Sequence, residues 1–221
     1  SHAVENIELL EDEEVKQFVG EYEPENYLLN PECPMAAGPY SVTDYYMEAK
    51  RSQAEGMRHA EQAVLDVAEK FKALSGRAYG LFESYRMEDA EKAVVMIGSA
   101  AGTAKDAVDR LRERGEKAGL IKIRLFRPFP AKAVAEALKN IKAVAIMDRA
   151  EGYTNHGGPL GADVMAALFR AKSAAHAVNI IYGLGGRDVR IEDIEKVFAD
   201  LQQIIDDDDA GETYRYMGIR E

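Results

Sequence analysis

The fold of this chain is decided by Arg124-Leu-Phe-Arg-Pro-Phe-Pro130 and by Ile146-Met-Asp-Arg149, which leads into Gly157-Gly-Pro-Leu160. In each, a segment of strand character ends in a polar or glycine-rich turn that precedes a helical pattern. In open α/β sheets, the edge formed by the carboxyl ends of the strands is where ligands and partner domains are bound. The two segments therefore predict an α/β domain with its functional groups along one edge of a sheet.

Apolar segments and amphipathic helical patterns alternate on both sides of these stretches. Strands are expected around 79–85, 93–97, 121–125, 143–147 and 177–182, with helices that end near residues 117, 139, 171 and 205. Short apolar strands separated by helices are typical of a parallel sheet covered on both faces. We therefore expect one α/β domain over residues 77–205, followed by an acidic tail over 206–221.

The first 76 residues have a different pattern. Prolines at 24, 31, 34 and 39 exclude a continuous helix, so residues 1–42 are expected to be irregular and extended. Their many large apolar side chains indicate that this segment lies along a neighbouring surface. Residues 43–76 predict one long linker helix, with Ser41 and Asp44 as a capping box and Gly76 as the C′ residue. Its second half carries a narrow apolar seam, from Met57 to Leu74, that we expect to pack against one surface.

Composition restricts the class of function. The 221 residues carry a formal net charge of −11, which disfavours binding to a nucleic-acid backbone. The sequence has no apolar run of the roughly 18–20 residues that a membrane-spanning helix needs. Cys33 is the single cysteine, and the chain starts without a basic and then apolar targeting segment, so we expect a cytoplasmic protein.

The turn Gly98-Ser-Ala-Ala-Gly-Thr103 lies where a phosphate-binding loop would be. Its glycines would allow close approach of an anion to the following helix start. Its spacing matches neither the dinucleotide-binding nor the P-loop pattern. Ser99 and Thr103 are therefore candidates for an anion site, with helix capping as the commoner interpretation.

Arginines and glycines mark the other strand ends. The prolines beside Arg127 fix the backbone, so this arginine is suited to bind a carboxylate or phosphate, or to bridge to a neighbouring strand end or subunit. Asp148 and Arg149 end a buried strand, and we expect them to pair with each other or with another domain. The remaining candidates for an anion-binding or inter-domain edge are Gly157, Gly158, Gly185 and Gly186. His156 is the only loop histidine suited to acid–base chemistry, but no obvious carboxylate or serine partner is expected beside it.

The order of these motifs resembles the α subunit of pyruvate:ferredoxin (or flavodoxin) oxidoreductase and related 2-oxoacid:ferredoxin oxidoreductases. The resemblance extends from about residue 15 to about residue 200 and is carried by the following segments. They are Gly38-Pro-Tyr40, Asp44-Tyr-Tyr-Met-Glu48 with Arg51, Gly76-Arg-Ala-Tyr-Gly80, Asp89-Ala-Glu91, Gly98-Ser-Ala-Ala-Gly102, Arg124-Leu-Phe-Arg-Pro-Phe-Pro130, Asp148-Arg149, Gly157-Gly-Pro-Leu160 and Gly183-Leu-Gly-Gly-Arg-Asp188.

The resemblance implies the carboxyl-terminal part of that subunit, a module similar to the C-terminal domain of transketolase. It implies a three-layer α/β/α sandwich with a mostly parallel five-stranded sheet, preceded by the linker helix. For the complete enzyme it implies thiamine diphosphate, magnesium, coenzyme A and iron–sulfur clusters, with ferredoxin or flavodoxin as the electron acceptor. This chain is expected to bind none of these cofactors, because the family's activating acid, metal site and cluster cysteines lie elsewhere.

Three functions follow as hypotheses. The first is a non-catalytic domain that contacts the other domains or subunits of the same oxidoreductase, with homo-oligomers possible. The second is an independent module that binds a small anion, or part of coenzyme A, at the carboxyl edge of the sheet. The third is a regulatory or interaction protein that uses its acidic ends and its long helix.

Overall fold

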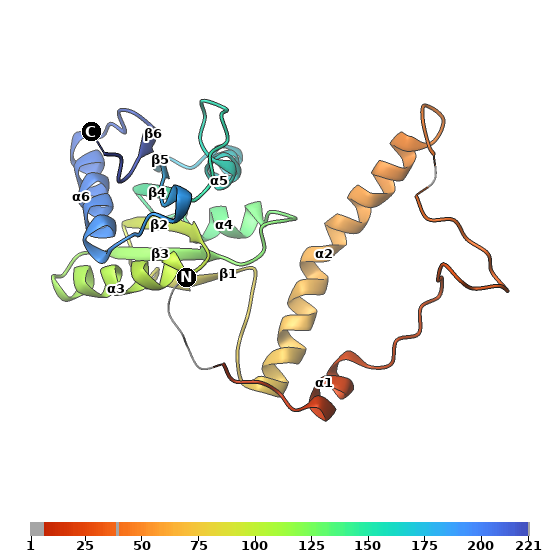
Figure 1. The fold of residues 1–221 in the computed structure, drawn as a ribbon. Coiled ribbons are helices and arrows are strands. Elements are labelled where there is room, and N and C mark those ends of the chain that lie inside the picture. Colours follow the sequence, from red (N-terminus) through yellow and green to blue (C-terminus); the bar gives the residue numbers. More distant parts are fainter. Residues whose placement is uncertain (1–6, 39, 221) are drawn as a thin grey trace. The chain divides into compact units, whose positions relative to one another are not determined.

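The computed structural model describes residues 7–38 and 40–220. The chain forms two compact units, unit 1 (Ser1–Tyr79) and unit 2 (Gly80–Glu221). In the described residues, unit 1 has two helices joined by a long irregular stretch, so the segment expected to be irregular contains one short helix, and unit 2 is an α/β domain (Figure 1). The first six residues and Pro39, which entered the expectations for the start of the chain, lie outside the described residues.

Unit 1 contains α1 (Asp12–Val19) and the long helix α2 (Tyr46–Ser75). Helix α2 ends as expected, because Gly76 adopts a left-handed conformation and its N–H donates to Lys72 O at 2.8 Å. The predicted capping box is wrong. Residues 43–45 form a turn, so Asp44 precedes the helix, and the N-cap residue is Tyr45, whose side chain makes no capping hydrogen bond.

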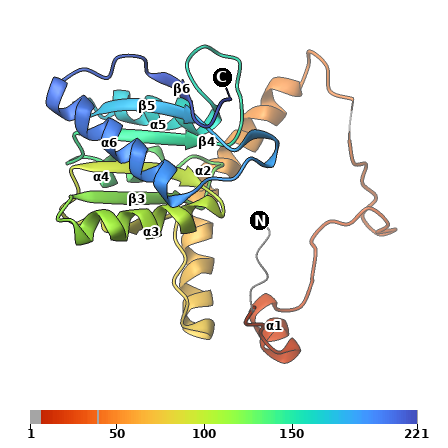
Figure 2. The same ribbon diagram turned by 60° about the vertical axis from the view of Figure 1, so that its left-hand side comes forward.

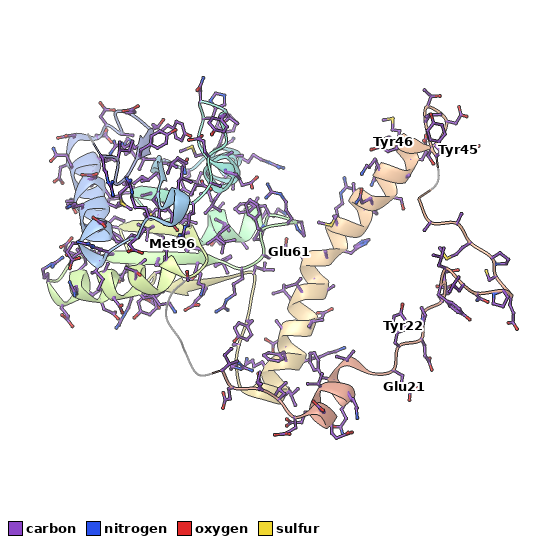
Figure 3. The ribbon with its side chains drawn as sticks, in the orientation of Figure 1. Glu21, Tyr22, Tyr45, Tyr46, Glu61 and Met96 are labelled. Carbon is purple, nitrogen blue, oxygen red and sulfur yellow. The ribbon has the colours of Figure 1, made fainter. Side chains whose placement is uncertain are left out.

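Aromatic side chains join α1 to the end of α2. The rings of Phe18 and Phe71 meet edge to face with centroids 5.9 Å apart, and the ring of Tyr79 lies 5.8 Å from that of Phe71. The predicted seam is at most half-buried, since no residue of α2 is fully buried and Val67 is 52% exposed. Tyr22, Tyr45 and Tyr46 extend outward from unit 1 (Figure 3). None of the described helices is long and apolar enough to cross a membrane.

Unit 2 is built on a six-stranded sheet in the order β1-β3-β2-β4-β5-β6. Its strands are β1 (Phe82–Tyr85), β2 (Lys92–Ile97), β3 (Ala118–Ile123), β4 (Ala143–Asp148), β5 (His176–Ile181) and β6 (Tyr214–Tyr216). Neighbouring strands are parallel except that β1 runs antiparallel to β3. The predicted mostly parallel sheet is confirmed, and it has six strands instead of the expected five.

Helices cover both faces of the sheet, which gives the predicted three layers. Helices α3 (Ala100–Glu113) and α6 (Ile191–Asp207) pack on one face, and α4 (Ala131–Ala137) and α5 (Pro159–Arg170) pack on the other (Figure 2). Because side chains alternate between the faces of a strand, each strand feeds both cores. Val94 and Met96 of β2 face α3 and α6, whereas Ala93 and Val95 face α4 and α5.

The extra strand lies in the stretch expected as an acidic tail, residues 206–221. Helix α6 continues through Asp207, and β6 then pairs with β5. Backbone bonds hold the strand at both ends, because Asn179 N–H donates to Thr213 O at 2.7 Å and Met217 N–H donates to Ile181 O at 2.9 Å. This stretch therefore completes the sheet.

Candidate functional site

The turns that follow β2, β3, β4 and β5 share one edge of the sheet, because these four strands run parallel. We call this edge the carboxyl rim. The candidate residues lie at the end of a strand, in these turns or at the starts of the helices that follow. They are Ser99 and Thr103 after β2, Arg127 after β3, Asp148, Arg149, Gly157 and Gly158 around the β4–α5 loop, and Gly185 and Gly186 after β5.

Asp148 is buried at the end of β4 and binds the start of α5. Its Oδ1 accepts a hydrogen bond from Leu160 N–H at 3.0 Å, and its Oδ2 accepts one from Gly161 N–H at 2.7 Å. The first N–H groups of a helix lack intrahelical partners and favour a negative charge. Asp148 therefore occupies the place where an anion would bind at this helix.

Asn179, in the middle of β5, completes the same network and is fully buried. Its Nδ2 donates to Asp148 Oδ2 at 2.9 Å and to Ile146 O at 2.8 Å, and its Oδ1 accepts from Gly158 N–H at 2.7 Å. The sequence analysis missed this residue. The available signal was an amide side chain inside an otherwise apolar strand.

The glycines at the start of α5 are required by this contact. A Cβ on Gly158 would lie 2.5 Å from Asp148 Cγ, and a Cβ on Gly161 would lie 2.5 Å from Asn179 Cγ. Gly157 has a φ of 128° and also abuts Asn179. We call these five residues the Asp148–Asn179 clamp. They close the β4–α5–β5 unit tightly and leave no space for a ligand between them.

Asp148 and Arg149 do not pair with each other, so that part of the expectation is wrong, whereas pairing with another domain stays a prediction. The two side chains leave the strand in different directions. Asp148 points to α5, while Arg149 Nε donates to Gly183 O at 3.1 Å. Arg149 thus ties the β4–α5 loop to the turn after β5.

Arg127 is engaged within unit 2. Its Nη1 donates to Asp163 Oδ2 at 2.6 Å and to Phe126 O at 2.7 Å, and its guanidinium lies 4.0 Å from the centroid of the Phe126 ring. The arginine thus links the β3–α4 turn to α5 and not to a neighbouring strand end, while contact with another subunit or an anion stays a prediction. Its side chain is still 53% exposed.

Ser99 and Thr103 are not brought into contact with the other candidates. Ser99 is exposed at the start of α3, and its hydroxyl makes no capping hydrogen bond. The interpretation of this turn as a side-chain cap is therefore wrong for Ser99. Thr103 lies half-buried one turn into the helix.

The β5–α6 turn carries Gly185 and Gly186 and contains a short 3₁₀ helix, η1 (Leu184–Gly186). A cavity of about 820 Å³ opens beside it. Its lining residues are Leu184, Gly185, Gly186, Arg187, Asp188, Arg190, Asp193, Gly218 and Arg220. We call it the arginine depression.

Glu151 fixes the β4–α5 loop to the edge strand. Its carboxylate accepts hydrogen bonds from the hydroxyls of Tyr214 and Tyr216 and from the N–H groups of Gly152 and Tyr153. These donors, with Tyr214 first, lower the pKa of Glu151 to about 2. Burial and the neighbouring carboxylate raise the pKa of Tyr214. The sequence analysis did not identify this cluster, which requires β6 to be placed in the sheet.

His156 is exposed in the same loop, and only its backbone N–H has a described hydrogen bond, to Thr154 Oγ1 at 3.3 Å. Its ring contacts no carboxylate or hydroxyl among the residues that the structure describes.

The described residues do not fit the metal-bound groups that the resemblance implies. Among them, no three His, Cys, Asp or Glu side chains are close enough to hold a metal ion. Cys33 is exposed and single, whereas iron–sulfur clusters are usually held by about four ligands. A magnesium-bound diphosphate needs carboxylate ligands at an open helix start, and Asp148 closes the start of α5.

Comparison with known proteins identifies the relatives of the chain. Residues 90–194 match the family model described as pyruvate:ferredoxin oxidoreductase core domain II. Residues 1–69 match the family described as pyruvate flavodoxin/ferredoxin oxidoreductase, thiamine diphosphate-binding. The second match covers the segment expected to be an irregular stretch and most of a linker helix.

Curated relatives match along the chain. The pyruvate synthase subunit PorA of Thermotoga maritima is 42% identical over 221 residues, which are 100% of this chain and 55% of the relative. The subunit of the same name from Methanocaldococcus jannaschii is 37% identical and covers 94% of this chain and 53% of the relative. The chain therefore spans about half the length of these relatives.

Among solved structures, a chain of 2-oxoglutarate:ferredoxin oxidoreductase from Magnetococcus marinus, with 2-oxoglutarate, coenzyme A and succinyl-CoA bound, is similar. It is 17% identical with a TM-score of 0.44, over 74% of this chain and 24% of that chain. A likeness of this degree adds nothing to the sequence matches. Those matches show that the chain belongs to the pyruvate:ferredoxin oxidoreductase family, as part of the α subunit.

Proposed function

We propose that this chain is a structural part of a 2-oxoacid:ferredoxin oxidoreductase α subunit and that it holds neighbouring domains and subunits in place. The complete enzyme would oxidatively decarboxylate a 2-oxoacid, with pyruvate as the substrate, to acyl-CoA. Thiamine diphosphate would supply the carbanion chemistry, and electrons would pass through iron–sulfur clusters to ferredoxin or flavodoxin. We place the enzyme in the cytoplasm.

The Asp148–Asn179 clamp is the observation that carries this proposal. In an open α/β sheet, a reactive or ligand-binding group is expected at the carboxyl rim. Here the buried polar atoms at the end of β4 are bonded to the backbone of α5 and β4. Arg127 and Arg149 extend the same pattern, because each bridges two segments of unit 2. The carboxyl rim around β4 therefore positions loops and has no catalytic role.

Unit 1 supports a contact role independently. Large apolar side chains stay exposed along its described residues, among them Tyr22 at 89%, Tyr45 at 72% and Met47 at 80%. Exposed apolar surface of this extent indicates an interaction site in a soluble enzyme. Its match to the thiamine diphosphate-binding family supports a partner within the same enzyme.

An activity assay tests whether this chain has a structural role only. We expect the 221-residue chain to show no reduction of methyl viologen with pyruvate, thiamine diphosphate, magnesium and coenzyme A. The complete enzyme, assayed in parallel, should be active. Turnover by the isolated chain above the rate without pyruvate would refute the proposal.

A substitution in the complete enzyme tests the contact role. Arg149→Ala removes an exposed cation that touches no reacting group. We expect the subunits of this variant to dissociate after a smaller dilution than those of the unaltered enzyme, as measured by mass photometry. The turnover of each assembled enzyme should stay unchanged. Lys196→Ala, on the exposed side of α6, is the matched control. An intact assembly with reduced turnover would show that the rim takes part in the reaction.

A further inference from the structure

Helix α5 is apolar on its outward side as well as on the side that packs against the sheet. The inner side is buried through residues such as Leu160, Val164 and Leu168. A helix that is apolar all round is typically buried on all sides. The outward side of α5 nevertheless faces solvent. Its residues are Ala162, Met165, Ala166 and Phe169, of which only Met165 is half-buried.

Phe169 is the largest side chain on this outward side. It lies in the last turn of α5 and is 84% exposed. Aromatic side chains bury a large apolar area when they are covered, so they contribute strongly to the energy of interfaces. A partner that covers Phe169 would therefore gain this contribution without any rearrangement of α5.

The two charged residues of α5 are Asp163, near its start, and Arg170, its last residue. Arg170 is exposed and forms no ion pair within the described parts of the chain. Asp163 binds Arg127 through Oδ2 at 2.6 Å, and its Oδ1 accepts no hydrogen bond from any described residue. The helix thus has an unpaired cation at one end and a carboxylate oxygen available to a second cation near the other.

Two copies of α5 in antiparallel orientation satisfy these groups together. Residues seven apart lie on the same side of a helix, because seven residues make about two turns. Ala162 and Phe169 therefore share one side, and Asp163 and Arg170 share a neighbouring side. With a two-fold axis beside Ala166, each Phe169 lies on the small Ala162 of the other copy, and each Arg170 lies beside the Asp163 of the other copy. A symmetric pair makes each of these contacts twice.

We propose that the outward side of α5 binds the same side of a second copy of this chain, in an antiparallel pair centred near Ala166. The charge complementarity and the size complementarity both select this one register. The 12 residues of α5 span about 18 Å, and a contact through one helix of this length buries less than the roughly 1,200 Å² of a stable interface. The dimer is therefore reversible. This inference goes beyond the proposed function, and its failure would leave that proposal untouched.

Analytical ultracentrifugation of the 221-residue chain, from micromolar to millimolar concentration, tests the proposal. Each chain has a net charge of −11, so the buffer should contain about 0.15 M salt, which screens the repulsion between copies beyond about 8 Å. We expect a monomer–dimer equilibrium whose dimer fraction rises with concentration.

Two substitutions at exposed positions test the contacts. Phe169→Ser should weaken the dimer by about a hundredfold, because two symmetric contacts worth about tenfold each are lost. Arg170→Gln should weaken it by roughly tenfold or less, as expected for two solvent-exposed ion pairs. Lys196→Gln, on the exposed side of α6, is the matched control and should leave the Kd of the dimer unchanged. Far-UV circular dichroism should show that all three variants are folded.

Single cysteines test the orientation, in a chain whose own exposed cysteine is removed by Cys33→Ser. Packed helices bring facing Cα atoms within the range of a disulfide, so Ala166→Cys should form a disulfide-linked dimer on mild oxidation. In the antiparallel pair, the two copies of residue 162 lie about 11 Å apart along the helix axis, beyond the roughly 7 Å limit, so Ala162→Cys should stay monomeric. Gly102→Cys, exposed on α3, is a second control and should not cross-link.

Three results would overturn the proposal. The first is a chain that stays monomeric up to millimolar concentration. The second is a dimer that Phe169→Ser leaves unchanged, because another surface would then join the copies. The third is cross-linking of Ala162→Cys or Gly102→Cys as fast as that of Ala166→Cys, because this would show a parallel pair or random collision.

Discussion

Adding one methyl group to Gly161 should destabilise unit 2, although alanine is the better helix former. Gly161 is the third residue of α5, where replacing glycine with alanine would by itself stabilise a helix by up to about 1 kcal/mol. Here the new Cβ would lie 2.5 Å from both Cγ and Nδ2 of Asn179. Asn179 is fully buried and cannot move into solvent, so its hydrogen bonds must distort.

The magnitude follows from these contacts. Overpacking a buried site costs about 1–3 kcal/mol, and each distorted buried hydrogen bond costs about 1 kcal/mol more. Asn179 makes three such bonds, to Gly158, Ile146 and Asp148. After the gain in helix propensity is subtracted, Gly161→Ala should lose about 2–4 kcal/mol of unfolding free energy.

Gly102→Ala is the matched control. Gly102 is the third residue of α3, is exposed, and has nothing within 4 Å of an added Cβ. This variant should gain up to about 1 kcal/mol. At roughly 2–4 °C per kcal/mol for a chain of this size, thermal melts should show Gly161→Ala about 5–15 °C lower than the parent and Gly102→Ala slightly higher. A Gly161→Ala variant that melts at or above the parent temperature would refute the account of the clamp.

Two further predictions concern carboxylates and their hydrogen-bonding or ionic partners. The pKa of Glu151 is about 2 in the folded chain, against an ordinary value of 4.5. The ionised carboxylate therefore stabilises its loop fully at pH values above 4.5, and this contribution is lost as the pH falls from about 4.5 towards 2. NMR signals of Tyr214 and Tyr216 should change over this pH range as the loop loses its contact with Glu151. In the control variant Glu151→Gln this pH dependence should disappear. Tyrosine signals of the unaltered chain that stay constant over this range would contradict the prediction. A double-mutant cycle of Arg127→Ala and Asp163→Ala should give a coupling below about 1 kcal/mol, because the arginine is half-exposed. A coupling above about 2 kcal/mol would show that the pair is buried in the working protein.

Much of the fold could be predicted because unit 2 follows simple periodic rules. The buried strands β2 and β4 are continuous apolar runs, and each is followed by an amphipathic helix, so strand type and layer order were clear. Strand β6 was missed because it has three residues beside a run of aspartates. Its polar and aromatic side chains give no buried pattern, and only its pairing with β5 identifies it.

The carboxyl rim could be predicted as a location, but its contacts could not. Parallel strands bring their carboxyl ends to one edge, so Arg127, Asp148 and Gly158 were placed correctly on it. The partner of Asp148 depends on where a residue 31 positions away in the sequence lies in three dimensions. Asn179 is adjacent to Asp148 only because β5 pairs with β4 in one register.

Helix α2 of unit 1 shows a different limit of prediction from sequence. Helix propensity and Gly76 located α2 and its end, because both are local properties. The apolar seam predicted that α2 packs against another surface, but the periodicity of a sequence does not identify which surface that is. In the described residues that seam meets α1 only near Phe71.

The two outer strands of the sheet also limit how this protein can associate. Strand β6 has three residues and carries Arg215, and β1 has four residues with a half-exposed glutamate, Glu83. Short strands with charged side chains are poor templates for the backbone of another chain. A second polypeptide therefore cannot readily extend the sheet sideways.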